Sequence, residues 1–96
     1  MDNMKFKDFA ERYGITEQKM FDILEIAKII KHDKMISGVK YAFCERFYKE
    51  DCLYKSIVVC YDSITNEIWW EVTPTGQSVL LNILNSYYGK EMNPVK

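Results

Sequence analysis

The chain has 96 residues, enough for a single domain over 1–96, and 48% of them are hydrophobic. Four Gly and two Pro exclude a linker-like or disordered chain. Thirteen Lys and Arg against fourteen Asp and Glu give a net charge of −1, whereas a dedicated nucleic-acid binder usually carries a basic excess. There is no apolar run of about 18 residues and no signal-peptide core, so we expect a cytoplasmic protein that makes no use of a membrane.

The residues that usually carry metal or catalytic chemistry are few and widely spaced. Cys44, Cys52 and Cys60 recur at eight-residue steps, whereas small zinc domains use close cysteine pairs. We expect them to be small apolar side chains, with no metal and no cofactor. His32 is the one histidine, in a lysine-rich segment that we expect to be a solvated loop, and no phosphate-binding loop or nucleophile elbow is present. The chain is therefore predicted not to be an enzyme.

The first 27 residues predict two helices joined by a tight turn. Apolar residues at helical spacing mark a first helix over 5–12, and Gly14 is placed to end it. Thr16 is the expected N-cap of the second helix. The apolar stripe of that helix consists of Met20, Ile23, Leu24 and Ala27. A small residue at Ala10 and a glycine at the turn are what a helix-turn-helix requires.

The remainder predicts a hairpin and a last helix. Two strands, about Cys52–Tyr61 and Glu67–Thr73, flank the turn-forming residues 62–66, and Pro74 is expected to end the second strand. A helix follows over about 76–88, and the tail 89–96 is expected to fray. Residues 28–30 fit either more helix or a short strand, 39–51 fit either a helix or a strand, and Ser37-Gly38 marks a turn. The predicted fold is a small α+β winged helix-turn-helix domain.

Two stretches of the chain resemble the C-terminal, KilAC-type domain of phage antirepressor proteins. They are FKDFAERYGITEQKMFDIL at 6–24 and IWWEVTPTGQSVLLNIL at 68–84, and T-P-x-G-Q at 73–77 is the most distinctive part. Between them, 39–48 lacks the glycine before an aromatic residue that the family usually shows. The resemblance implies a phage or prophage regulator with a winged-helix-like domain.

The helix-turn-helix predicts one possible use, the reading of DNA by the second helix. Gln18 suits an adenine edge and Lys19 a phosphate, but Glu17, Asp22 and Glu25 on the same helix would face a polyanion. The full set of DNA-contact candidates is Thr16, Gln18, Lys19, Lys28, Lys31, Lys34 and Lys40. The more basic half of the chain, 1–49, has ten basic and eight acidic residues. So small an excess predicts only weak binding to the phosphates of DNA.

An excess of aromatic side chains predicts the other use, which is binding to a protein. Trp69 and Trp70 are adjacent in a predicted strand and must point to opposite faces. Either 40–50 covers the second face or one tryptophan lies exposed as an interface anchor. The partner-binding candidates are Phe21 and Asp22 on the outward face of the second helix, with Trp69, Trp70, Tyr87 and Tyr88. We favour a small regulator or inhibitor that occludes a repressor or a host defence protein, with sequence-specific DNA binding and a homodimer as alternatives.

Overall fold

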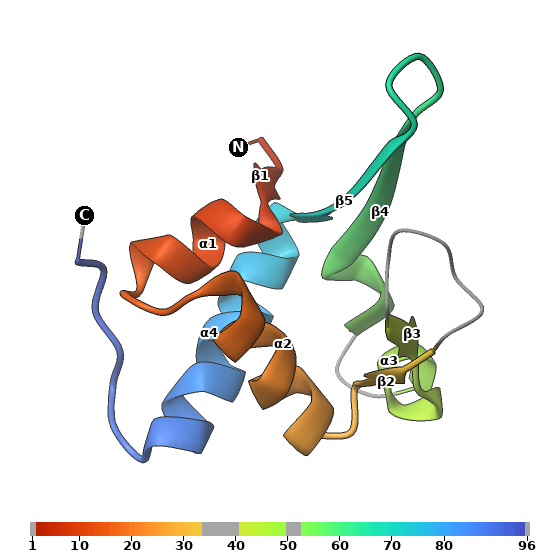
Figure 1. The fold of residues 1–96 in the computed structure, drawn as a ribbon. Coiled ribbons are helices and arrows are strands. Elements are labelled where there is room, and N and C mark those ends of the chain that lie inside the picture. The colour runs from red at the N-terminus through yellow and green to blue at the C-terminus, as the bar shows by residue number, and fades with distance from the viewer. Residues whose placement is uncertain (1, 34–40, 50–52, 96) are drawn as a thin grey trace.

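The computed structural model describes residues 2–33, 41–49 and 53–95 and has an α+β fold (Figure 1). Its elements in chain order are β1 (Met4–Lys5), α1 (Phe6–Arg12), α2 (Glu17–Ile26), β2 (Ile30–His32), β3 (Tyr41–Phe43), α3 (Glu45–Lys49), the 3₁₀ turn η1 (Leu53–Lys55), β4 (Ile57–Asp62), β5 (Glu67–Val72) and α4 (Pro74–Tyr88). The predicted order of two helices, a hairpin and a last helix is present. β1 adds a third strand to the hairpin, in the order β1-β5-β4, while β2 and β3 form a separate sheet.

The turn between α1 and α2 forms as the sequence predicts. Gly14 has a φ of 75°, a left-handed conformation that glycine adopts without strain. The amide of Ile15 then donates to the carbonyl of Ala10 at 3.1 Å, which closes the turn. Thr16 caps α2, because its hydroxyl accepts from the amide of Lys19 at 3.0 Å. These local bonds set the angle at which the two helices leave the turn.

The hairpin is shorter at its start than the sequence predicts. β4 begins at Ile57 rather than at 52, because Leu53–Lys55 form a 3₁₀ turn in which the amide of Ser56 donates to the carbonyl of Leu53 at 2.8 Å. Leu53, Ser56 and Ile57 are the buried residues here, which is a helical spacing and not the alternation of a strand. The turn at 62–66 is confirmed, and Asp62 accepts from the amide of Ile64 at 2.8 Å.

The last helix starts two residues before its predicted start at 76. Pro74 does not merely end β5 but occupies the first turn of α4, where its missing amide costs nothing and its fixed φ suits a helix. Thr73 is the N-cap and accepts from the amide of Gly76 at 3.0 Å. Its own hydroxyl donates to the carbonyl of Lys55, so the cap also ties α4 to η1.

The segment 39–51, for which helix and strand were both open, contains one of each within its described part. Tyr41–Phe43 form β3, which pairs antiparallel with β2, and Glu45–Lys49 form α3. Residues 28–30 were open to more helix or a short strand. Lys28 has a φ of 61°, which ends the helix, and β2 begins at Ile30, so the strand is observed. His32 therefore lies at the end of β2 and not in a loop. The predicted turn at Ser37-Gly38 lies outside the described residues.

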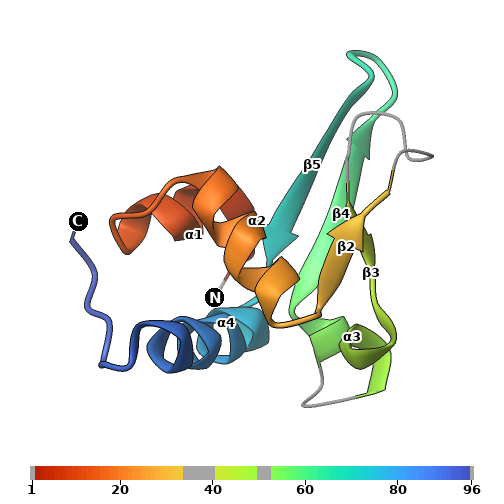
Figure 2. The same ribbon diagram turned by 60° about the horizontal axis from the view of Figure 1, so that its bottom comes forward.

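Helices α1, α2 and α4 pack together on one side of the molecule, and the β4–β5 hairpin projects away from them (Figures 1 and 2). The hydrophobic core draws on these helices, on the hairpin, and on β2, β3, α3 and η1. After Gly89 the chain turns back toward the end of α1, where the amide of Val95 donates to the carbonyl of Arg12 at 2.7 Å (Figure 2). Fraying of 89–96 stays a prediction. Within the described ranges, no helix is long and apolar enough to cross a membrane.

Candidate functional site

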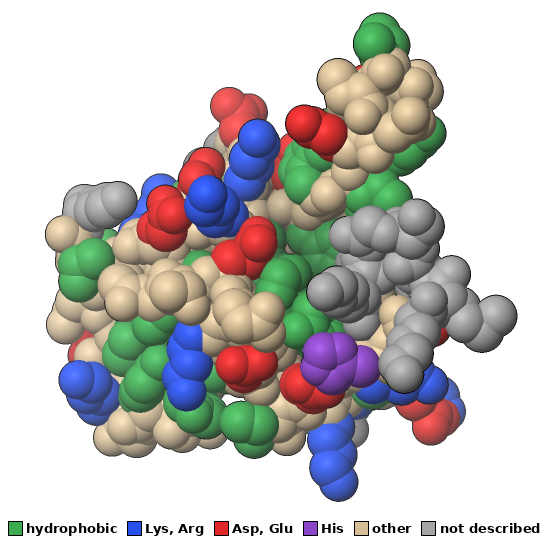
Figure 3. All heavy atoms as spheres, in the orientation of Figure 1, with side chains coloured by type: hydrophobic (Ala, Val, Ile, Leu, Met, Phe, Trp, Pro, Cys, Tyr) green, Lys and Arg blue, Asp and Glu red, His purple; other side chains and the backbone are tan. Residues whose placement is uncertain are grey.

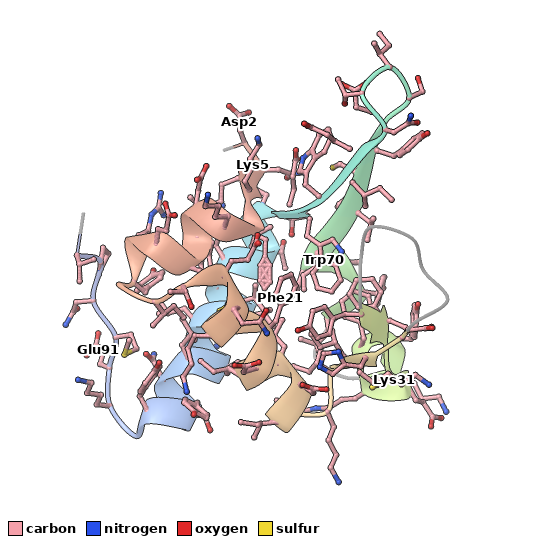
Figure 4. The ribbon with its side chains drawn as sticks, viewed as in Figure 1. Asp2, Lys5, Phe21, Lys31, Trp70 and Glu91 are labelled. Carbon is pink, nitrogen blue, oxygen red and sulfur yellow. The ribbon has the colours of Figure 1, made fainter. Side chains whose placement is uncertain are left out.

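The two adjacent tryptophans serve different parts of the molecule. Trp70 is 4% exposed and lies in an aromatic cluster, with its ring centroid 5.0 Å from Phe43, 5.1 Å from Phe21 and 5.5 Å from Phe6 (Figure 4). The segment around 41–47 therefore packs on the same face of the hairpin as α1 and α2. It does not cover the second face, which carries Trp69, so the alternative in which 40–50 covers that face is not observed among the described residues. Trp70 is not a surface residue, and its indole nitrogen has no hydrogen-bond partner among the described residues.

Phe21 was expected on the outward face of α2, and this orientation is wrong. Its ring stacks on Tyr41 at 4.5 Å and lies 4.8 Å from Phe6, so the side chain is half-buried. Figure 4 shows Phe21 and Trp70 pointing toward one another. The helical pattern of α2 placed Phe21 opposite the apolar stripe, but the stripe could not show that β3 packs on this side of the helix.

Trp69 lies on the opposite face of the hairpin and is half-buried. Its indole nitrogen donates to Glu71 Oε2 at 2.9 Å, and Lys5 Nζ lies 5.8 Å from its ring centroid. The hydrogen bond from Trp69 is the main cause that lowers the pKa of Glu71 below its ordinary value. Of the two tryptophans, Trp69 is the one that a partner can reach.

The DNA-contact candidates on α2 are already engaged within the chain. Gln18 Nε2 donates to Asp22 Oδ1 at 3.0 Å and to the Tyr41 hydroxyl at 2.9 Å. Lys19 Nζ donates to the Tyr87 hydroxyl at 2.9 Å, and this bond raises the pKa of Lys19. The Thr16 hydroxyl serves as the helix cap. Reading bases with these residues would require breaking contacts that now hold α2 to β3 and α4.

The remaining basic candidates do not form a continuous surface in the described part of the chain. Lys28 and Lys31 are exposed, and Lys31 points away from the helices (Figure 4). Lys34 and Lys40 lie outside the described residues. On the face that carries α1 and α2, basic side chains lie singly among acidic ones (Figure 3). His32 Nε2 lies 3.5 Å from Glu25 Oε2, so a carboxylate sits beside this strand end as well.

A groove of about 780 Å³ lies between α2 and α4. It is lined by Ile23, Ile26, Ala27, Arg46, Leu53, Val79, Asn82, Ile83, Ser86 and Tyr87. Ile26 is 63% exposed and Tyr87 is 39% exposed, so two large apolar side chains stand at its rim. Hydrophobic side chains reach the surface over the lower ends of α2 and α4 in Figure 3. The arrangement suits the apolar side chains of a ligand or a partner.

One end of the groove is held by α3. Arg46 Nη1 donates to the carbonyl of Ala27 at 2.6 Å, which satisfies a carbonyl at the C-terminal end of α2. Arg46 thus positions α3 against α2, and among the described residues that line the groove it is the one charged side chain. The sequence placed Arg46 in a segment of open structure, so this role was not foreseen.

Among the tyrosines proposed for partner binding, Tyr87 lies at the groove and Tyr88 packs beside it, with ring centroids 4.9 Å apart. Ile26, Val79 and Ile83 of the groove were not among the candidates. A usable signal existed, because Val79, Ile83 and Tyr87 follow one another at i, i+4 and i+8 on α4. This row lies beside the fully buried Leu80 and Leu84, so the apolar face of α4 is wider than the part that the core buries.

No group of three or more His, Cys, Asp or Glu side chains within the described ranges is placed to hold a metal ion. Cys44 and Cys60 are free and half-buried, and Cys52 lies outside the described residues. Burial raises the pKa of the Cys60 thiol above its ordinary value. Comparison of the chain with protein-family models, with curated proteins and with solved structures gave no match.

Proposed function

We propose that the protein is a small non-enzymatic regulator or inhibitor that acts by binding a protein target in the groove between α2 and α4. The single observation that carries the proposal is the groove itself, open and lined mainly by aliphatic side chains, with Ile26 and Tyr87 at its rim. Exposed apolar surface of this kind marks sites of association. The resemblance to the antirepressor domain supports a phage or prophage origin, with a repressor or a host defence protein as the target.

The occupant that best fits this groove is an amphipathic helix of the target. Two neighbouring helices, α2 and α4, form the walls, and their apolar residues repeat at three- and four-residue spacing. A third helix that presents aliphatic side chains at the same spacing packs into such a groove, as in other helix-in-groove complexes. Binding there would occlude the helix of the target, which is the mechanism of an inhibitor.

The test uses two matched isoleucine variants of the whole chain. Ile26 lies at the groove, whereas Ile64 lies at the hairpin tip and is 92% exposed. Ile26→Glu and Ile64→Glu make the same chemical change at exposed sites, so circular dichroism should show both folded. We expect wild type and Ile64→Glu to capture the same protein from the cells that make this chain, and Ile26→Glu to lose it. Equal loss by both variants, or capture by none, overturns the proposal.

Sequence-specific DNA binding is the second candidate function. The glycine turn between α1 and α2 and the projecting hairpin favour it, because both are features of a winged helix-turn-helix domain. Lys28 and Lys31 are the exposed basic residues available to phosphates. Duplex fragments from the surrounding locus should then bind with a sequence preference at low salt. Lys28→Glu with Lys31→Glu should weaken that binding, and Lys7→Glu with Lys90→Glu is the matched control. Each lysine that neutralises a phosphate contributes roughly 0.9 to the logarithmic salt slope.

A further inference from the structure

The outer face of the β4–β5 hairpin is the side opposite Trp70. Three cross-strand pairs line it, because directly opposed residues point to the same side: Val58 with Glu71, Cys60 with Trp69, and Asp62 with Glu67. Within the described residues, neither Val58 nor Trp69 belongs to the hydrophobic core or to the side chains packed against it. Val58 is 42% exposed. An aromatic ring and an aliphatic side chain therefore lie on a sheet face that the core does not use.

The charges on this outer face are predominantly negative. Glu67, Trp69 and Glu71 alternate along β5, so a carboxylate flanks the indole on either side. Asp62 lies directly opposite Glu67, and like charges in that position are unfavourable in the isolated protein. The backbone amides of Ile64 and Thr65 lower the pKa of Asp62, and hydrogen bonding to Trp69 lowers that of Glu71, so both carboxylates hold their charge.

One cation of the chain already lies at this face. Lys5 of β1 is exposed, and its Nζ lies 5.8 Å from the Trp69 ring centroid, near the outer limit for attraction between a cation and a ring. The coulombic effect of Lys5 also contributes to the lowered pKa of Glu71. The outer face thus already attracts one positive side chain. Lys5 balances only part of the negative charge of this face.

We propose that the outer face of the hairpin binds an arginine-bearing segment of a protein partner. A guanidinium stacks on an indole ring and pairs with a carboxylate in its own plane. Trp69 offers the ring and the exposed Glu67 offers the carboxylate, while Glu71 already accepts from the Trp69 indole nitrogen. An ammonium group lacks this planar geometry, so arginine is the expected side chain. The surface is separate from the groove between α2 and α4, and the proposal stands whether or not the groove has an occupant.

The test measures the affinity of the whole chain for a short peptide in which three arginines are spaced by Gly-Ser. Its counterpart carries citrulline, which keeps the shape and removes the charge. Fluorescence anisotropy of the labelled peptide gives the dissociation constant, and salt should weaken the binding. We expect the arginine peptide to bind and the citrulline peptide to bind at least about threefold more weakly. Equal binding of the two peptides, or none by wild type, overturns the proposal.

Charge-matched variants separate the outer face from general attraction to an acidic protein. Glu67→Gln and Trp69→Leu should each weaken the arginine peptide about threefold or more, whereas Glu91→Gln in the exposed tail should not. Lys5→Gln should strengthen it, because the competing cation is removed, and the control Lys90→Gln should leave it unchanged. If Glu91→Gln weakens binding as much as Glu67→Gln, or Lys90→Gln strengthens it as much as Lys5→Gln, the proposed site is wrong.

Discussion

Gly76 lies where the first turn of α4 passes the backbone of Ser56. A Cβ atom on Gly76 would lie 2.1 Å from the Ser56 carbonyl oxygen and 2.6 Å from its Cα, distances that no side chain could tolerate. The same carbonyl accepts from the amide of Thr73 at 3.0 Å, so neither segment can move away freely. In the sequence, this glycine belongs to the T-P-x-G-Q stretch. Close packing against Ser56 explains why this position needs a glycine, and local helix propensity alone would not have predicted it.

We therefore predict that Gly76→Ala lowers the free energy of unfolding by about 3 kcal/mol, the upper end for overpacking. Gly89→Ala is the control, because its φ of 67° is left-handed but nothing lies within 4 Å of an added Cβ. That variant should lose only about 1 kcal/mol. Urea unfolding followed by circular dichroism measures both. Equal losses would show that α4 and Ser56 do not approach as closely as described.

At the scale of elements, the parts that the sequence predicts are those with local signals. α1 and α2 follow from helical spacing, a glycine turn and a threonine cap, and the β4–β5 hairpin follows from the turn residues 62–66. The β2–β3 pair joins segments that are apart in the sequence, so periodicity alone left it open, whereas 53–55 were predicted as strand and form η1 instead. The wrong orientation predicted for Phe21 has the same origin, because Tyr41, which stacks on its ring, belongs to β3, a segment distant from α2 in the sequence.

We expect the hairpin turn to make a pH-dependent contribution to stability. The amides of Ile64 and Thr65 donate to Asp62 and depress the pKa of its carboxyl group in the folded state. A depressed folded-state pKa stabilises the protein above the unfolded-state pKa, and that stability is lost as the pH falls through the folded-state value. We predict that Asp62→Asn is less stable than wild type at about pH 7 and that the difference shrinks toward about pH 2.5.

Urea unfolding at the two pH values measures this difference. Asn keeps an oxygen that can accept in the turn, so the comparison isolates the charge of the carboxylate. A wild-type advantage at Asp62 that persists unchanged at acid pH would contradict the assignment.

At the scale of the whole molecule, the aromatic cluster around Trp70 joins α1, α2, β3 and β5, and the C-terminal tail closes the other end. Met92 packs against the core, its amide donates to Asn85 Oδ1 at 2.7 Å, and the amide of Val95 donates to the carbonyl of Arg12 at the end of α1. Neither the sequence pattern after Gly89 nor its composition predicts these contacts. The α+β class, the three longer helices and the β4–β5 hairpin were predictable from local patterns, whereas the groove arises from how α2, α3 and α4 meet.

We predict that removal of residues 90–96 lowers the free energy of unfolding by about 1–2 kcal/mol, from lost burial of Met92 and lost hydrogen bonds. Met92→Ala keeps the backbone bonds and should account for about half of the loss. Chemical denaturation of the three chains measures this. If the shortened chain is as stable as wild type, the tail is frayed in solution, as its sequence alone suggests.

The central claim is that a protein partner docks between α2 and α4. Its most direct measurement is photo-crosslinking in the cells that make the protein, with a benzophenone amino acid placed at Ile26 in one chain and at Ile64 in another. We predict that the groove position yields one crosslinked protein, identified by mass spectrometry, and that the hairpin tip yields none. A protein crosslinked equally from both positions, or DNA recovered in place of protein at Ile26, would contradict the account.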